Sequence, residues 1–98
     1  MYARVSTLHG PPELVAEELA VLRDAVIPAF EKRSGFRGVI GLIEPERGQS
    51  IVMSLWSREA DMQATDEEAR LLRDATAEAG RDQVLSVDRY EVAVFEVR

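Results

Sequence analysis

The middle of the chain carries Phe36-Arg-Gly-Val-Ile-Gly-Leu-Ile-Glu44 and, after a polar turn, Ser50-Ile-Val-Met-Ser-Leu-Trp-Ser57. Both segments are typical of β-strands. Neither alternates regularly between apolar and polar residues, which indicates that both faces of each strand lie away from water. The helices of a 98-residue chain can cover only one face of such a hairpin. The other face would be a large exposed apolar surface in a monomer, so the hairpin predicts a homodimer whose sheets meet face to face.

The composition indicates one ordinary globular domain over residues 1–98. The chain is 46% hydrophobic and 31% charged, with a net charge of −6 and no cysteine. A chain this acidic lacks the basic face that binds nucleic acid or anionic membranes, so neither is expected as a partner. The absence of cysteine excludes disulfides, thiolate nucleophiles and iron–sulfur clusters. Residues 2–8 are typical of a strand and no leader or membrane-spanning run is apparent, so we expect a cytoplasmic location.

The segment after the first expected strand has the period of a helix. It begins at Gly10-Pro11-Pro12, and proline is favourable in a first helical turn. Apolar residues then recur every three or four positions along one stripe, which predicts an amphipathic helix. Pro28 is expected to kink this helix or to end its regular part, and Ser34-Gly35 to terminate it. The stripe consists of Val15, Leu19, Leu22, Val26 and Phe30.

A second helix and a final strand are expected after the hairpin. Thr65 and Glu68 have the spacing of a capping box, in which each side chain bonds a backbone N–H at the start of a helix. That helix is expected to end at Gly80. The last apolar run, residues 84–97, is much longer than the usual strand of about 5 to 6 residues. Its far end is therefore expected to reach beyond its own sheet.

The expected elements follow the order strand, helix, strand, strand, helix, strand. This βαββαβ order is that of a ferredoxin-like α+β domain, in which a four-stranded antiparallel sheet carries both helices on one face. The bare face is then the dimer surface inferred from the hairpin. Two such sheets packed together would form a dimeric α+β barrel, closed at its rim by the long last strands.

Three further segments point to a family. They are Gly35-Phe-Arg-Gly38, Ser54-Leu-Trp-Ser-Arg-Glu-Ala60 and Val87-Asp-Arg-Tyr-Glu-Val-Ala-Val-Phe-Glu-Val97. Together they resemble the antibiotic biosynthesis monooxygenase (ABM) domains of the dimeric α+β barrel superfamily, and the resemblance extends over essentially the whole chain. It implies a cofactor-independent monooxygenase that acts on a small aromatic or polyketide-like molecule without metal or flavin.

The same superfamily has a haem-degrading branch, and this chain lacks its pattern. That pattern has an Asn on the first strand, a Trp in the helical segment after the third strand and a His on the second long helix. This chain has Ser6 or Thr7 in the first place, no Trp beyond Trp56 and no His beyond His9. Haem degradation is therefore not expected.

Five residues on the expected strands are candidates for binding a substrate. Phenol, guanidinium, hydroxyl and indole groups in a mostly apolar pocket would orient a polyphenol or quinol. In the alternative interpretation, the arginine pairs with a strand carboxylate, Glu91 or Glu96, the tyrosines fill the barrel ends and the tryptophan belongs to the core. The candidates are Tyr2, Arg4, Ser54, Trp56 and Tyr90.

No cofactor is expected, and the sequence singles out no catalytic residue. His9 is the only histidine, and with no cysteine or second histidine at ligand spacing it does not form a usual transition-metal site. A glycine-rich nucleotide-binding motif is also absent. Two functions stay open. One is the cofactor-independent monooxygenase, and the other is a non-catalytic small-molecule-binding or stress-response protein on the same barrel.

Overall fold

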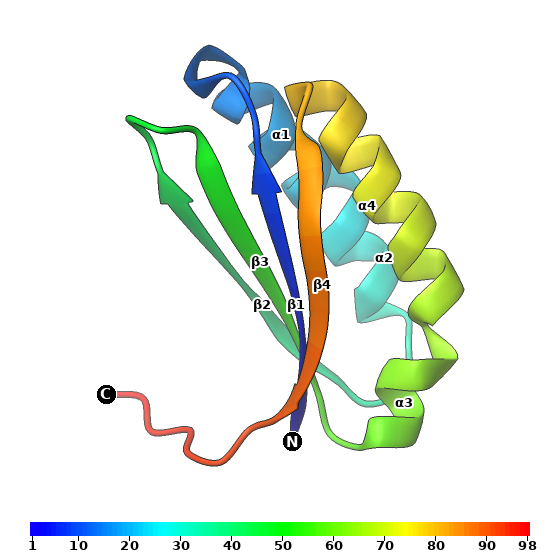
Figure 1. The fold of residues 1–98 in the computed structure, drawn as a ribbon. Coiled ribbons are helices and arrows are strands. Elements are labelled where there is room, and N and C mark those ends of the chain that lie inside the picture. The colour runs from blue at the N-terminus through cyan, green and yellow to red at the C-terminus, as the bar shows by residue number, and fades with distance from the viewer.

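The computed structural model describes all 98 residues, and its four strands form one antiparallel sheet (Figure 1). The strands are β1 (Tyr2–His9), β2 (Phe36–Glu44), β3 (Gln49–Trp56) and β4 (Gln83–Glu91). They pair in the order β2-β3-β1-β4, so β1 lies between β3 and β4. This is the ferredoxin-like topology, and the predicted fold class is confirmed.

The helices all lie on one side of this sheet and form a single layer (Figure 1). A first helical segment connects β1 to β2, and a second connects β3 to β4; α1 of the first packs against α4 of the second. No helix is both long and apolar enough to cross a membrane. The elements of the layer are η1 (Pro12–Leu14), α1 (Val15–Val21), η2 (Leu22–Val26), α2 (Ile27–Glu31), α3 (Glu59–Ala64) and α4 (Asp66–Gly80).

The first helical segment continues through Pro28, which lies inside α2. The sequence predicted a kink or the end of the regular helix at this proline. The regular α-helix does end early, because η2 is a π-helical turn, but the segment resumes as α2. A π turn bonds each amide to the fifth residue back, and this wider turn accommodates a residue that has no N–H. The predicted apolar stripe is preserved, since Leu22, Val26 and Phe30 are all buried.

Gly35 has the predicted left-handed conformation just before β2, although the first helical segment itself ends earlier, at Glu31. The φ of Gly35 is +79°, and a Cβ at this position would lie 2.1 Å from Oδ2 of Asp61. Only glycine satisfies both the backbone conformation and the available space. The carbonyl of Gly35 accepts a hydrogen bond from the N–H of Ser57 at 2.8 Å. This bond ties the start of β2 to the end of β3.

The predicted capping box at Thr65 is wrong. Oγ1 of Thr65 donates to the carbonyl of Met62 at 2.8 Å, and it bonds no N–H of α4. The same oxygen accepts a hydrogen bond from the buried guanidinium of Arg4. Glu68 forms an ion pair with Arg33 instead. The spacing was misleading because both side chains have partners from distant parts of the chain.

The predicted length of the last strand is also wrong, because β4 ends at Glu91. Glu91 lies opposite Tyr2, which is the first residue of β1. Beyond this point a single chain offers no strand to pair with, and only one further bond forms, from the N–H of Val92 to the carbonyl of Met1. Residues 92–98, here called the tail, leave the sheet (Figure 1).

The core lies between the helix layer and the sheet and is centred on Trp56. The indole is fully buried, with 0% exposure. Its ring packs edge-on against Phe30 and Phe36, with ring centroids 5.2 Å and 5.4 Å away. This geometry is the favourable one for aromatic pairs.

The other side of the sheet carries an apolar surface that no helix covers, here called the open face. Arg4 and Ser54 are paired and point toward the helices, so their neighbours Val5 and Met53, which are also paired, point the other way. Ile40 and Leu42 of β2 are 39% and 47% exposed. The open face comprises Val5, Ile40, Leu42, Ile51 and Met53.

Candidate functional site

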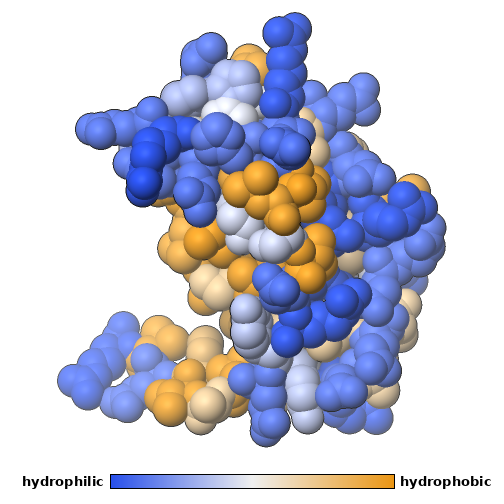
Figure 2. Space-filling view, viewed as in Figure 1, coloured by the Kyte–Doolittle hydropathy of each residue, from blue (hydrophilic) through white to orange (hydrophobic).

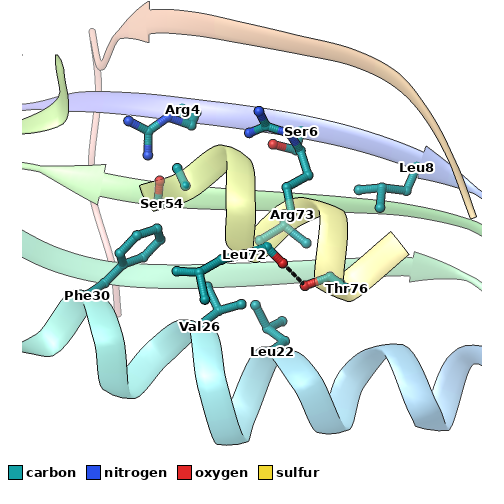
Figure 3. Close-up of a pocket in the computed structure, with 12 residues that line it drawn as sticks. Arg4, Ser6, Leu8, Leu22, Val26, Phe30, Ser54, Leu72, Arg73 and Thr76 are labelled. Atoms are coloured by element: carbon teal, nitrogen blue, oxygen red, sulfur yellow. Dashed lines mark hydrogen bonds between the residues drawn. The ribbon is translucent and has the colours of Figure 1, made fainter. Parts of the chain in front are cut away.

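A cavity lies between the helix layer and the sheet (Figure 3). Its volume is about 40 Å³, more than the ~10–15 Å³ that one water molecule needs and well below the ~300 Å³ of a site for a drug-sized ligand. Strands β1 and β3 form one wall, and the first helical segment and α4 form the others. The large apolar lining residues are Leu8, Leu22, Val26, Phe30, Val52 and Leu72.

The polar lining residues come from both walls. β1 contributes Arg4 and Ser6, and β3 contributes Ser54. Arg73 and Thr76 come from α4, and Figure 3 shows Arg73 reaching across from that helix toward β1. No carboxylate, histidine or tyrosine lines the cavity. Its walls therefore offer hydrogen-bond donors and positive charge, but no side chain that ordinarily accepts a proton near neutral pH.

Arg4 is buried, with 3% exposure, and reaches the junction of α3 and α4. Its Nη2 donates to the carbonyl of Met62 at 2.6 Å, to Oγ1 of Thr65 at 3.1 Å and to Oδ1 of Asp66 at 2.7 Å. Burial lowers the pKa of Arg4, and the bond to Asp66 opposes that change. The alternative interpretation of the sequence was therefore right that Arg4 forms an ion pair and wrong about its partner, which is neither Glu91 nor Glu96.

Arg4 also has two nitrogens without an acceptor. Nε and Nη1 are buried, and neither has a hydrogen-bond partner. Buried donors are nearly always paired, and an unpaired one destabilises a protein by about 1–3 kcal/mol. Arg4 lines the cavity, so a ligand bound there would lie beside a guanidinium whose hydrogen-bonding capacity is only partly used.

The structure brings together some of the predicted site residues and separates others. Arg4 and Ser54 lie opposite each other on paired strands and both line the cavity. Trp56 lies behind that wall, where its Nε1 donates to Oγ of Ser54 at 3.0 Å and the Arg4 guanidinium lies 5.9 Å from its ring centroid. Tyr2 packs against the same core. Tyr90 pairs with Ala3, on the opposite face of the sheet, and is 56% exposed.

Arg73 is a cavity residue that the sequence analysis did not identify. It lies four residues after Ala69 and three before Thr76, in the middle of the face that α4 turns toward the core. A charged residue at such a position breaks the apolar stripe of an amphipathic helix. That break in the pattern was the available signal.

A buried pair of carboxyl groups lies outside the cavity. Glu18 of α1 is 4% exposed and accepts a hydrogen bond from Oγ of Ser50 at 2.5 Å. Asp82, which follows α4, lies close enough to Glu18 that the ionisation of each affects the other, and its buried Oδ2 has no hydrogen-bond partner. Burial raises the pKa of both carboxyl groups, and the interaction with Glu18 partly offsets this for Asp82. A proton held between the two carboxyl groups would satisfy both, so we expect them to share one.

Replacing Asp82 with Asn is expected to stabilise the protein more as the pH rises. The pKa values of Glu18 and Asp82 are higher in the folded protein than in the unfolded chain. The pair therefore contributes fully to the free energy of unfolding below the ordinary carboxyl pKa of about 4, and this contribution is lost as the pH rises through the folded-state pKa values. An amide donates to Glu18 without ionising. The variant should match the wild type near about pH 4 and exceed its free energy of unfolding by about 1 kcal/mol near about pH 8.

Urea unfolding of both proteins at the two pH values measures this difference. Asp74→Asn is the matched control, because Asp74 is 60% exposed and distant from the pair in sequence. A stabilisation by Asp82→Asn that is the same at both pH values would contradict a shared proton.

Comparison of the sequence with known proteins identifies relatives without a described function. No family model matches the chain. Two uncharacterized proteins of Mycobacterium tuberculosis, Rv2557 and Rv2558, are 33% and 34% identical to it over 80% and 79% of its length. The aligned part covers 35% and 33% of these proteins. The chain thus spans about a third of the length of the curated relatives it matches.

Comparison of the structure with solved structures is more informative. A Deinococcus radiodurans protein assigned to the antibiotic biosynthesis monooxygenases superposes with a TM-score of 0.74 at 16% identity, over 100% of this chain and 99% of that one. SnoaB, a cofactor-independent oxygenase from Streptomyces nogalater, gives a TM-score of 0.70 at 16% identity, over 96% and 94% of the two chains. The chain has the ABM fold. A third similar structure is the ActVA-Orf6 monooxygenase of Streptomyces coelicolor, solved with the ligand nanaomycin D. This monooxygenase superposes with a TM-score of 0.69 at 13% identity, over 98% of this chain and 92% of that one.

Proposed function

We propose that this protein binds a small, mostly apolar organic molecule in the cavity between the helix layer and the sheet, and that it does so as a homodimer of single domains. The observation that carries the proposal is the cavity itself, where six large apolar side chains surround unfilled space. Protein interiors pack as densely as organic crystals, and unfilled space forfeits dispersion contacts. A bound apolar molecule would supply those contacts.

The size of the cavity limits the ligand. At about 40 Å³, it takes a molecule of at most a single ring unless the helix layer moves outward. Leu72 and Arg73 of α4 are only half-buried, so this helix forms the wall nearest to solvent. We therefore expect entry past α4.

The homodimer is supported by two apolar surfaces that a single chain leaves uncovered. One is the open face, and the other is the tail, where Val94, Phe95 and Val97 are 81%, 54% and 74% exposed. Figure 2 shows apolar side chains over the sheet and on the tail, on either side of a hollow. A second copy that packs its own sheet on the open face would bury that face. The edge of the second sheet would then lie where the tail of the first copy can cover it.

Cofactor-independent oxygenation is the second candidate function, and the ABM fold shared with SnoaB favours it. Such a reaction begins with removal of a proton from the substrate, whose anion then reacts with oxygen. Because the cavity walls carry no carboxylate, histidine or tyrosine, they offer no evident base for that step. Binding without turnover is therefore the function that the geometry supports better.

Calorimetry with a panel of single-ring and fused-ring phenols, quinols and anthrones tests both candidates. At least one compound is expected to bind saturably to the wild type. Ala69 lines the cavity, so Ala69→Leu should fill it and weaken binding by about tenfold or more, since overpacking a site costs about 1–3 kcal/mol. Ala75→Leu on the exposed side of the same helix is the matched control and should bind as the wild type does.

An oxygen electrode separates the two functions. Saturable binding without oxygen uptake would identify a binding protein, and uptake that Ala69→Leu abolishes would identify an oxygenase. Absence of binding across the panel, with both variants folded by circular dichroism, would contradict the proposed function.

A further inference from the structure

Positive charge is concentrated around the cavity of a protein that is acidic overall. The whole chain has a net charge of −6. At one end of the cavity, however, Arg4, Arg73 and Arg89 lie close enough to one another that their charges interact. Asp66 is the one carboxylate that forms ion pairs with this group, bonding Arg4 at 2.7 Å and Arg89 at 3.1 Å.

Arg73 forms no ion pair and no side-chain hydrogen bond of its own. The charge of Asp74 acts on it and favours its charged form, but the carboxylate of Asp74 pairs with Arg70. Burial lowers the pKa of Arg73, and the charge of Arg4 lowers it further. A half-buried guanidinium beside a second one is unfavourable unless an anion lies nearby.

Arg4, on the opposite wall of the cavity, lacks hydrogen-bond acceptors for two of its nitrogens. One hydrogen on Nε and two on Nη1 have no acceptor, and both nitrogens are buried. Arg4 is held in place by its three bonds through Nη2, so its free nitrogens cannot turn to the solvent without breaking them. An acceptor for them would have to enter beside Arg4, which lines the cavity.

We propose that the ligand of this cavity is an organic anion, with a carboxylate or phenolate oxygen held between Arg4 and Arg73 and an apolar body against Leu22, Val26 and Phe30. The inference deepens the proposed small-molecule binding and rests on it. An anionic oxygen supplies the missing acceptor and the missing negative charge at once, and charge-assisted hydrogen bonds of this kind are about twice as strong as neutral ones. The electropositive end of the cavity also attracts anions to an otherwise acidic surface.

Pairs of probes, one anionic and the other a neutral analogue of similar shape, test this inference. Benzoate, cyclohexanecarboxylate and 2-naphthoate are compared by calorimetry with their primary amides, and 4-nitrophenolate is compared with nitrobenzene above the pKa of the phenol. At least one anion should bind about tenfold or more tightly than its neutral counterpart. Comparing the carboxylate probes with the phenolate probe shows which of the two anionic groups the site binds.

Two arginine variants on the same helix locate the effect. Arg73→Gln should weaken binding of the anion by about tenfold or more and leave binding of the neutral counterpart unchanged. Arg73→Lys keeps the charge and should retain most of the affinity. Arg70→Gln removes the same charge from the exposed side of α4 and should have no effect.

The outcomes distinguish this inference from the function on which it rests. If acids and amides bind equally well, or if Arg73→Gln and Arg70→Gln behave alike, the anion site is wrong and the binding function stands. If no probe of either charge binds, both are wrong. Should Arg73→Gln fail to fold, the comparison of charged and neutral probes on the wild type decides alone.

Discussion

Replacing Trp56 with alanine is expected to lower the free energy of unfolding by about 3–5 kcal/mol, the usual loss when a large aromatic side chain is removed from a core. The indole has no exposed surface, and it packs against Phe30 and Phe36. Its Nε1 also donates a hydrogen bond to Oγ of Ser54 at the cavity wall. Alanine would leave a void at the centre of the core and an unpaired buried hydroxyl beside it.

Urea unfolding followed by far-ultraviolet circular dichroism measures this loss, because Trp56 is the only tryptophan and the variant has no tryptophan fluorescence. Trp56→Phe keeps most of the aromatic packing and should cost less than the alanine variant. Leu85→Ala removes a side chain that is 53% exposed and should change stability by about 0.5 kcal/mol or less. A loss below about 1 kcal/mol for Trp56→Ala would contradict the central place of Trp56 in the core.

Replacing Met53 with aspartate is expected to abolish the proposed homodimer. Met53 lies in the middle of the open face, paired with Val5 on one side and Ile40 on the other. In a symmetric dimer each copy would place one carboxylate in the apolar interface, and each unpaired buried charge costs about 3 kcal/mol or more. The dissociation constant should therefore rise by roughly four orders of magnitude.

Analytical ultracentrifugation at micromolar concentration measures the assembly state. The wild type should sediment as a dimer of 10.9 kDa chains, and Met53→Asp as a monomer or an unfolded chain. Met53→Leu keeps the apolar surface, and Gln63→Asp adds the same charge on the exposed side of α3; both should stay dimeric. A folded wild-type monomer would rule out the dimer, and a dimeric Met53→Asp would mean that another surface is used.

Features of the fold that depend on local periodicity could be predicted from the sequence. The hairpin, the stripe that ends at Phe30, and the left-handed conformation of Gly35 all follow from spacing and from backbone preference, and the structure confirms them. The end of β4 could not be predicted in this way. It is set by Tyr2, the first residue of the neighbouring strand, and the sequence of β4 itself does not record where its partner begins.

The candidate site was predictable only in part, for a related reason. Alternation along each strand grouped Arg4 with Tyr2 on β1 and Ser54 with Trp56 on β3, and Arg4 and Ser54 both line the cavity. The pairing of Arg4 with Asp66 joins positions 62 residues apart, and no local pattern indicates it. Tyr90 was grouped with them by residue type, but the register of β4 places it on the other face.

The π-helical turn over Leu22–Val26 has a mechanical consequence for the cavity. Its first and last residues both line the cavity, so the helix layer is least regular where the ligand would press against it. Changing a turn bonded to the fifth residue back into an ordinary α turn would move one residue out of the helix and rotate the segments on either side. We therefore expect the first helical segment to bend at this turn when a molecule larger than the cavity binds, with the four strands left in register.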